Sequence, residues 1–98
     1  MVLNVNDNIK TVKMNASGRV QGVGFRWATI QIAESLDISG WVKNEPDGSV
    51  SILASGSHEN LDHFIEKIRQ SPTSFAKVRS LQINYIAKRV NKGFNVKY

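Results

Sequence analysis

A glycine-rich string that ends in an arginine is the part of this sequence best suited to chemistry. It reads Gly18-Arg19-Val20-Gln21-Gly22-Val23-Gly24-Phe25-Arg26. Glycines let the chain turn sharply and leave main-chain N–H groups that no Cβ shields, so an anion can approach the backbone closely. A helical apolar period follows the string, and the N-terminus of a helix attracts anions. The string therefore predicts a phosphate-binding loop, in which the Arg26 guanidinium donates hydrogen bonds to two phosphate oxygens.

The string matches neither of the common nucleotide-binding patterns. Gly22-Val23-Gly24 opens a GxGxxG pattern, but Trp27 stands where the third glycine belongs. No Lys-Ser or Lys-Thr pair follows, as the P-loop of nucleotide hydrolases requires. A purely structural glycine turn is the alternative, and the arginine two positions after the last glycine argues against it.

Five strands and two helices are predicted around this loop. Alternating apolar residues indicate strands at Thr11–Ser17, Trp41–Asn44, Val50–Ala54, Leu81–Tyr85 and Phe94–Tyr98, and helical stripes cover Phe25–Leu36 and Leu61–Ile68. The order strand, helix, strand, strand, helix, strand, with one strand appended, is typical of the α+β ferredoxin-like βαββαβ sandwich. We expect an antiparallel sheet of four to five strands with both helices on one face. That fold hosts enzymes, RNA-binding modules and sensors, so it does not decide the function.

Length and composition limit the classes of protein to which the chain can belong. Its 98 residues fit one domain, which we place at residues 11–98 after a flexible leader at residues 1–10. The absence of cysteine excludes a disulfide scaffold, a thiolate metal site and a cysteine nucleophile. No run of 18 apolar residues and no secretory signal is present, so we expect a cytoplasmic monomer without a membrane partner.

The charge is unevenly distributed along the chain. Up to Glu66 the sequence has five Lys or Arg and eight Asp or Glu; from Lys67 onwards it has eight Lys or Arg and no acid. A basic C-terminal third attracts nucleic acid, anionic membranes or small anions, and charge alone does not choose among them.

A second motif, read together with the glycine string, resembles the acylphosphatase family. Gly40-Trp41-Val42-Lys43-Asn44 precedes an Asp47-Gly48 turn, and the resemblance runs from about Thr11 to Tyr98. It implies an enzyme that hydrolyses the carboxyl-phosphate anhydride of small acyl phosphates to a carboxylate and inorganic phosphate. It also implies that no metal or other cofactor is needed.

The resemblance assigns roles to particular residues. By motif position, Arg26 is similar to the family's phosphate-binding arginine and Asn44 to the asparagine that holds the attacking water. The remaining phosphate-binding residues would be Arg19, Val20, Gln21, Gly22, Val23, Gly24 and Phe25. In several family members a terminal carboxylate helps to hold the arginine, which the resemblance places at Tyr98. Lys43 departs from the arginine that many members carry there.

Two other functions stay open at this point. A non-catalytic RNA-binding or anion-binding ferredoxin-like module shares the element order, but Thr11–Ser17 and Val50–Ala54 contain no aromatic residue to stack on bases. We therefore expect no nucleic-acid partner. The second alternative is a regulatory or carrier domain of the kind that begins a larger carbamoyl-transfer enzyme.

The remaining residues able to do chemistry do not indicate a further site. His58 and His63 are five apart, off the spacing at which two histidines on a helix bind a metal, so no metal site is predicted. Trp27 and Trp41 are predicted to be core or near-core aromatics.

Overall fold

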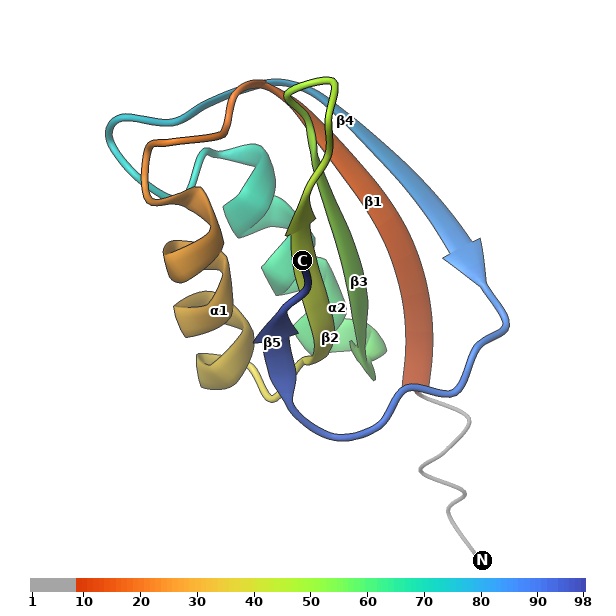
Figure 1. Cartoon of the computed structure of the whole chain (residues 1–98). Coiled ribbons are helices and arrows are strands. Elements are labelled where there is room, and N and C mark those ends of the chain that lie inside the picture. Colours follow the sequence, from red (N-terminus) through yellow and green to blue (C-terminus); the bar gives the residue numbers. More distant parts are fainter. Residues whose placement is uncertain (1–8) are drawn as a thin grey trace, which may run out of the picture.

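The computed structural model describes residues 9–98, which form a five-stranded sheet covered by two helices (Figure 1). The elements are β1 (Ile9–Arg19), α1 (Phe25–Ser35), β2 (Ser39–Asn44), β3 (Val50–Ser57), α2 (His58–Arg69), β4 (Lys77–Ile86) and β5 (Phe94–Val96). This is the predicted order, with β5 as the appended strand. Of the predicted leader, Ile9 and Lys10 already belong to β1, and residues 1–8 lie outside the described residues.

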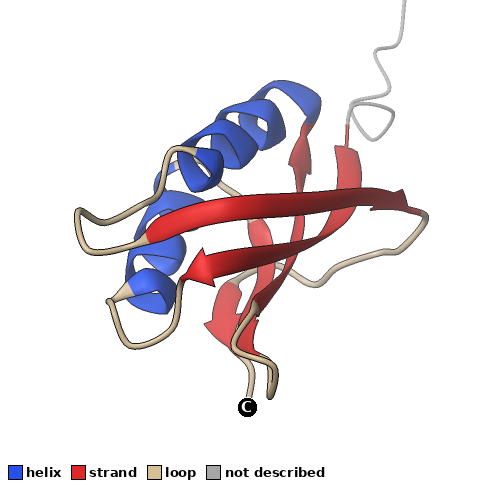
Figure 2. Cartoon of the chain, turned by 90° about the horizontal axis from the view of Figure 1, so that it is seen from above, coloured by secondary structure: helices blue, strands red, loops and turns tan. Residues whose placement is uncertain are grey.

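The sheet has the strand order β4-β1-β3-β2-β5, and Figure 2 shows both helices on one of its faces. β1 runs antiparallel to β3 and β4, and β2 runs antiparallel to β3. β5 pairs with β2 in parallel, so the sheet is mixed rather than wholly antiparallel. The chain turns back after β4, so β5 runs in the direction opposite to β4. Strand β2 also runs opposite to β4, and β5 is therefore parallel to β2. The predicted ferredoxin-like α+β fold is confirmed.

The core lies between the sheet and the two helices. Val12, Met14 and Ala16 alternate along β1 and are at most 1% exposed, because every second side chain of a strand points to the same face. Phe64 of α2 packs against Phe94 of β5, with ring centres 6.1 Å apart. Phe25 of α1 belongs to the same buried core, so the core holds both helices on the sheet and with them the end of the loop that joins β1 to α1.

The two tryptophans are not placed as expected. Trp27 is 68% exposed, so its prediction as a core residue was wrong. The buried Phe25 defines the inner face of α1, and a residue two positions later lies about 200° around the helix, on the outer face. Trp41 is half-buried and lies on the opposite face of β2 from the buried Val42. Its side chain is therefore on the sheet face that carries no helix.

Candidate active site

The β1–α1 loop and the end of β2 meet at a cavity of about 290 Å³. It is lined by residues of the loop, α1, β2 and the C-terminal segment, namely Val20, Gly22, Gly24, Phe25, Arg26, Trp27, Ile30, Asn44, Val96 and Tyr98. The structure thus brings the two predicted catalytic residues, Arg26 and Asn44, to one cavity. They are 18 positions apart in the sequence and come from different elements.

The backbone of the loop takes a conformation that favours glycine. Gly22 and Gly24 have φ angles of 74° and 77°, in the left-handed region. A Cβ on Gly22 would meet no atom within 4 Å, and on Gly24 the nearest atom would be Thr73 Cγ2 at 3.9 Å. Backbone conformation, not crowding, therefore requires glycine at both positions, and the space beside Gly22 is open.

Helix α1 begins at this loop without a capping side chain. Its N-cap residue is Gly24, no side chain accepts a hydrogen bond from the first turn, and the first turn contains no acidic residue. The first helical hydrogen bond runs from Ala28 N to Gly24 O, at 3.0 Å. The amides before Ala28 thus have no acceptor within the helix, and they lie at its positive end beside the cavity. This arrangement suits an anion.

Side-chain hydrogen bonds hold the loop from two sides. Gln21 Nε2 donates to the main-chain oxygens of Glu45 and Ser49, each at 2.8 Å. Thr73 Oγ1, from the segment between α2 and β4, donates to Val23 O at 3.1 Å. The loop is therefore tied to the β2–β3 turn on one side and to the α2–β4 connection on the other.

The turn after β2 is fixed by an aspartate and a serine. Asp47 Oδ1 accepts hydrogen bonds from Ser49 N at 2.9 Å and from Ser49 Oγ at 2.6 Å. These bonds hold the pKa of Asp47 below its ordinary value. Glu45 N donates to Ser49 O at 2.8 Å, which closes the Asp47-Gly48 turn that the sequence predicts. The turn keeps the end of β2, and with it Asn44, in a defined place.

Asn44 is the last residue of β2, and its side-chain oxygen lacks a hydrogen-bond donor in residues 9–98. Its Oδ1 atom is buried, and among residues 9–98 nothing donates a hydrogen bond to it. Leaving a buried acceptor unpaired typically costs about 1–3 kcal/mol. Asn44 also lines the cavity, and an unpaired amide oxygen at this place is suited to accept a hydrogen bond from a small hydroxylic molecule.

Arg26 is half-buried and lies against an aromatic ring. Its guanidinium carbon is 5.7 Å from the centre of the Tyr98 ring, within the range of an attractive cation–π contact. The resemblance led us to expect a carboxylate at Tyr98 to hold this arginine. In residues 9–98 it is the Tyr98 ring that contacts Arg26. No ion pair joins Arg26 to a carboxylate in that range.

Three residues of the predicted phosphate site do not line the cavity. Arg19 is exposed at the end of β1, whereas Gln21 and Val23 form the hydrogen bonds that tie the loop down. Sequence reasoning missed Thr73, since its bond to Val23 spans 50 positions and leaves no local pattern.

Neither a metal cluster nor a membrane helix is found in the part of the chain that the structure describes. No three His, Cys, Asp or Glu side chains of residues 9–98 gather as a cation site would require. Neither helix of that range is long and apolar enough to cross a bilayer.

Comparisons with known proteins give an independent view of the fold and the family. Residues 12–96 match the family model described as Acylphosphatase. An acylphosphatase of Lactobacillus johnsonii is 54% identical over 78 residues, which are 80% of this chain and 86% of the relative. One from Oceanobacillus iheyensis is 43% identical over 91 residues, 92% of this chain and 100% of the relative. The crystal structure of acylphosphatase from Bacillus subtilis matches with a TM-score of 0.85 at 33% identity, over 91% of this chain and 99% of that one. The chain therefore belongs to the acylphosphatase family.

Proposed function

We propose that this hydrolase cleaves the carboxyl-phosphate anhydride of small acyl phosphates at the Arg26–Asn44 cavity, giving a carboxylate and inorganic phosphate. Family membership supports the reaction. One observation carries the assignment of the site. An uncapped helix N-terminus, a guanidinium and a buried, unpartnered amide oxygen lie around one small cavity.

The loop and Arg26 bind the phosphoryl group in this proposal. Main-chain amides between Val20 and Phe25 donate to its oxygens, and the positive end of α1 favours the charge. The guanidinium donates two charge-assisted hydrogen bonds, which are about twice as strong as neutral ones. Arg19, exposed at the end of β1, adds long-range attraction for the anion.

Asn44 positions the nucleophile. Its Oδ1 accepts a hydrogen bond from a water molecule and holds the water oxygen in line with the bond to be broken. The water oxygen forms a bond to phosphorus, the P–O bond to the acyl group breaks, and its electron pair leaves on the carboxylate. A carboxylate whose acid has a pKa of about 4–5 leaves without a general acid. The proton of the water passes to a phosphoryl oxygen of the substrate, since an amide is no base.

The pH dependence of turnover tests this assignment. Among residues 9–98 no histidine and no carboxylate side chain lines the cavity. We therefore expect kcat to vary little between about pH 6 and 8 and to be unaffected by EDTA. Initial rates with acetyl phosphate across this range, with and without EDTA, measure both. A bell-shaped profile, or a rate lost with the chelator, would contradict a mechanism built on binding and positioning.

We further propose that the protein is a cytoplasmic monomer without a nucleic-acid or membrane partner. The cysteine-free sequence fits a reducing compartment. On the sheet face without helices, the ring of Trp41 is contacted by the ammonium groups of Lys13 and Lys97, at 5.6 and 4.7 Å from its centre. The neighbouring strands β1 and β3 contain no aromatic residue, so the centre of the sheet offers no second ring on which successive bases could stack. Light scattering should give a mass near 10.9 kDa, and titration with single-stranded RNA at physiological salt should show no binding.

A further inference from the structure

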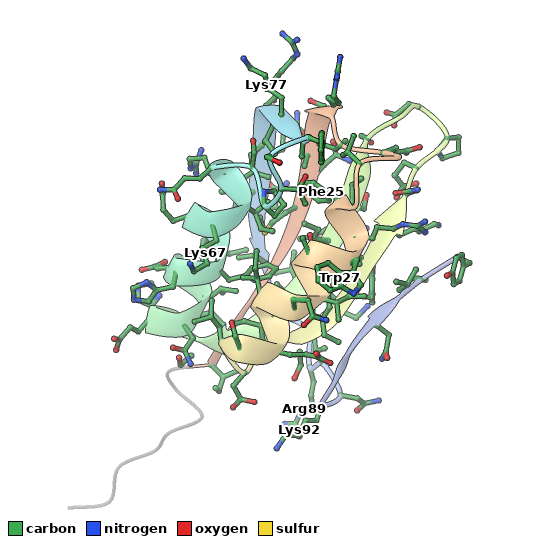
Figure 3. All side chains as sticks on the ribbon, turned by 90° about the vertical axis from the view of Figure 1, so that its left-hand side faces the viewer. Phe25, Trp27, Lys67, Lys77, Arg89 and Lys92 are labelled. Carbon is green, nitrogen blue, oxygen red and sulfur yellow. The ribbon has the colours of Figure 1, made fainter. Side chains whose placement is uncertain are left out.

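The cavity has two kinds of lining. Its polar side consists of the loop glycines, Arg26 and Asn44, to which the proposed reaction is assigned. Its other side is apolar and consists of Trp27 and Ile30 from α1 together with Val96 and Tyr98 from the C-terminal segment. Trp27 and Ile30 are three residues apart, so they share one face of the helix. In Figure 3, Trp27 lies on the outer side of α1.

The two aromatic residues of this apolar side are largely in contact with solvent. Trp27 is 68% exposed and Tyr98 93% exposed, although large apolar side chains are commonly buried. Exposed aromatic rings beside a cavity gain free energy when a ligand covers them. The fold needs neither ring for its core, so both can contact a substrate, with Tyr98 also in contact with Arg26.

Charge restricts the ligand that this side can accept. Within residues 9–98, Arg26 is the one cationic side chain that lines the cavity, and the proposed phosphoryl group already uses it. A second negative charge, on the acyl group, would therefore find no further cationic partner among the residues that line the cavity. The volume of about 290 Å³ is at the small end of ligand cavities, which typically measure about 300–1,000 Å³.

We infer that Trp27, Ile30, Val96 and Tyr98 form a subsite for the acyl group. The substrates favoured by this subsite are acyl phosphates with a small aromatic or other apolar acyl group. Acyl phosphates that carry a further carboxylate are disfavoured. This inference rests on the proposed function, because it assigns the phosphoryl group to the polar side of the same cavity.

Substrate comparison with a tryptophan variant tests the subsite. Benzoyl, acetyl and succinyl phosphate present an aromatic, a methyl and a carboxylate-bearing acyl group. We expect kcat/KM to fall in that order, with benzoyl phosphate about 10-fold above acetyl phosphate, because a ring in contact with Trp27 and Tyr98 is desolvated. In Trp27→Ala the ratio of benzoyl to acetyl phosphate should fall about 10-fold, mainly through KM for benzoyl phosphate.

Phe75 provides a matched control. It is also an aromatic residue, 74% exposed, but it lies between α2 and β4 and does not line the cavity. Phe75→Ala should leave the ratio of benzoyl to acetyl phosphate unchanged. Thermal unfolding of both variants checks that they fold. An equal ratio in the parent, Trp27→Ala and Phe75→Ala, or a preference for succinyl phosphate, would overturn the inference.

Binding of phosphonates separates the subsite from the reaction. In phenacylphosphonate and acetonylphosphonate a CH₂ group replaces the bridging oxygen, so neither can be hydrolysed at that bond. Calorimetry should show that the parent protein binds phenacylphosphonate about 10-fold more tightly, and that Trp27→Ala loses this difference. If acyl phosphates were not hydrolysed while this difference persisted, the proposed function would fail and the subsite would stand. Equal affinities for the two phosphonates would refute the subsite, whether or not the enzyme turns over.

Discussion

The two helices of this protein begin in opposite ways. Helix α2 is capped by Ser57, whose Oγ accepts a hydrogen bond from Asn60 N at 3.1 Å, and Glu59 follows in its first turn. Helix α1 starts at Gly24 in a left-handed conformation, with no capping side chain and no acidic residue. A cap and an acidic first turn satisfy the amides and the dipole of a helix that has only to be stable. In α1 the same groups remain free beside a cavity.

Tertiary contacts replace the missing cap of α1. Gln21 and Thr73 tie the preceding loop to two distant segments, whereas the cap of α2 comes from the adjacent residue Ser57. A local cap stabilises a helix by about 1 kcal/mol but occupies one of its free amides. The loop before α1 is held instead through the Gln21 side chain and the Val23 carbonyl. These hydrogen bonds use none of the free amides in the first turn of α1. The contrast predicts that changes at the start of α1 affect activity and that changes at the start of α2 affect stability.

The largest effect is expected from Arg26→Ala. Removal of one preorganised hydrogen-bond donor typically lowers the rate about 10²- to 10³-fold, and a charged, two-pronged donor should contribute at least the upper value. We expect kcat/KM for acetyl phosphate to fall about 10³-fold or more and inhibition by inorganic phosphate to be lost. Arg69→Ala, in the last turn of α2, is the control and should retain both. Strong phosphate inhibition that survived in Arg26→Ala would move the anion site elsewhere.

A smaller effect is expected from Thr73→Val, which changes a contact to the loop before α1. This nearly isosteric change removes two hydrogen bonds of the Thr73 hydroxyl, the one that it donates to Val23 O and the one that it accepts from Ala76 N. It leaves the half-buried Val23 carbonyl without its donor. The loop should be less well held, so KM should rise several-fold, to about 10-fold, while kcat changes less. Steady-state kinetics with acetyl phosphate give both constants. Unchanged kinetics would show that the loop keeps its shape without this tie.

Ser57→Ala should affect stability alone. Loss of an N-cap typically lowers the free energy of unfolding by about 1 kcal/mol. Urea denaturation measures this as a lower midpoint with an unchanged slope. Since Ser57 lies outside the cavity, kcat/KM should stay within about twofold of the parent value. A loss of activity comparable with that of Thr73→Val would remove the distinction between the two helix starts.

Local sequence patterns predicted most of the fold. Alternation in β1, the helical stripe of α2 and the Asp47-Gly48 turn all depend on near neighbours, and the structure confirms each of them. The family resemblance is confirmed as well. The parallel pairing of β5 was not predicted, because it depends on where a long connection returns to the sheet.

The site was predicted only in part, because some of its contacts join segments that are far apart in the sequence and leave no local pattern. Arg26 and Asn44 belong to recognisable motifs, and the structure brings them to one cavity, although their chemical roles stay predictions. The contact of Thr73 with Val23 and that of the Tyr98 ring with Arg26 join segments far apart in the chain. The exposure of Trp27 was mispredicted because a tryptophan was assigned to the core by its residue type and not by its angle on the helix.

The central claim is a division of labour, in which the start of α1 with Arg26 binds the phosphoryl group and Asn44 holds only the water. The variant Asn44→Asp separates holding water from accepting its proton. Its carboxylate is a stronger base but repels an anionic substrate, so we expect poor activity. A variant as fast as the parent would replace the water-holding role with general-base catalysis.

The most direct test measures two constants on Asn44→Ala, namely kcat for acetyl phosphate and the inhibition constant of inorganic phosphate. In the proposed mechanism the deleted amide contacts the nucleophile and not the bound phosphate. We therefore expect kcat to fall at least about 10²-fold while the inhibition constant changes less than about threefold. A variant that keeps its kcat, or that loses phosphate inhibition as strongly as Arg26→Ala, would contradict the division.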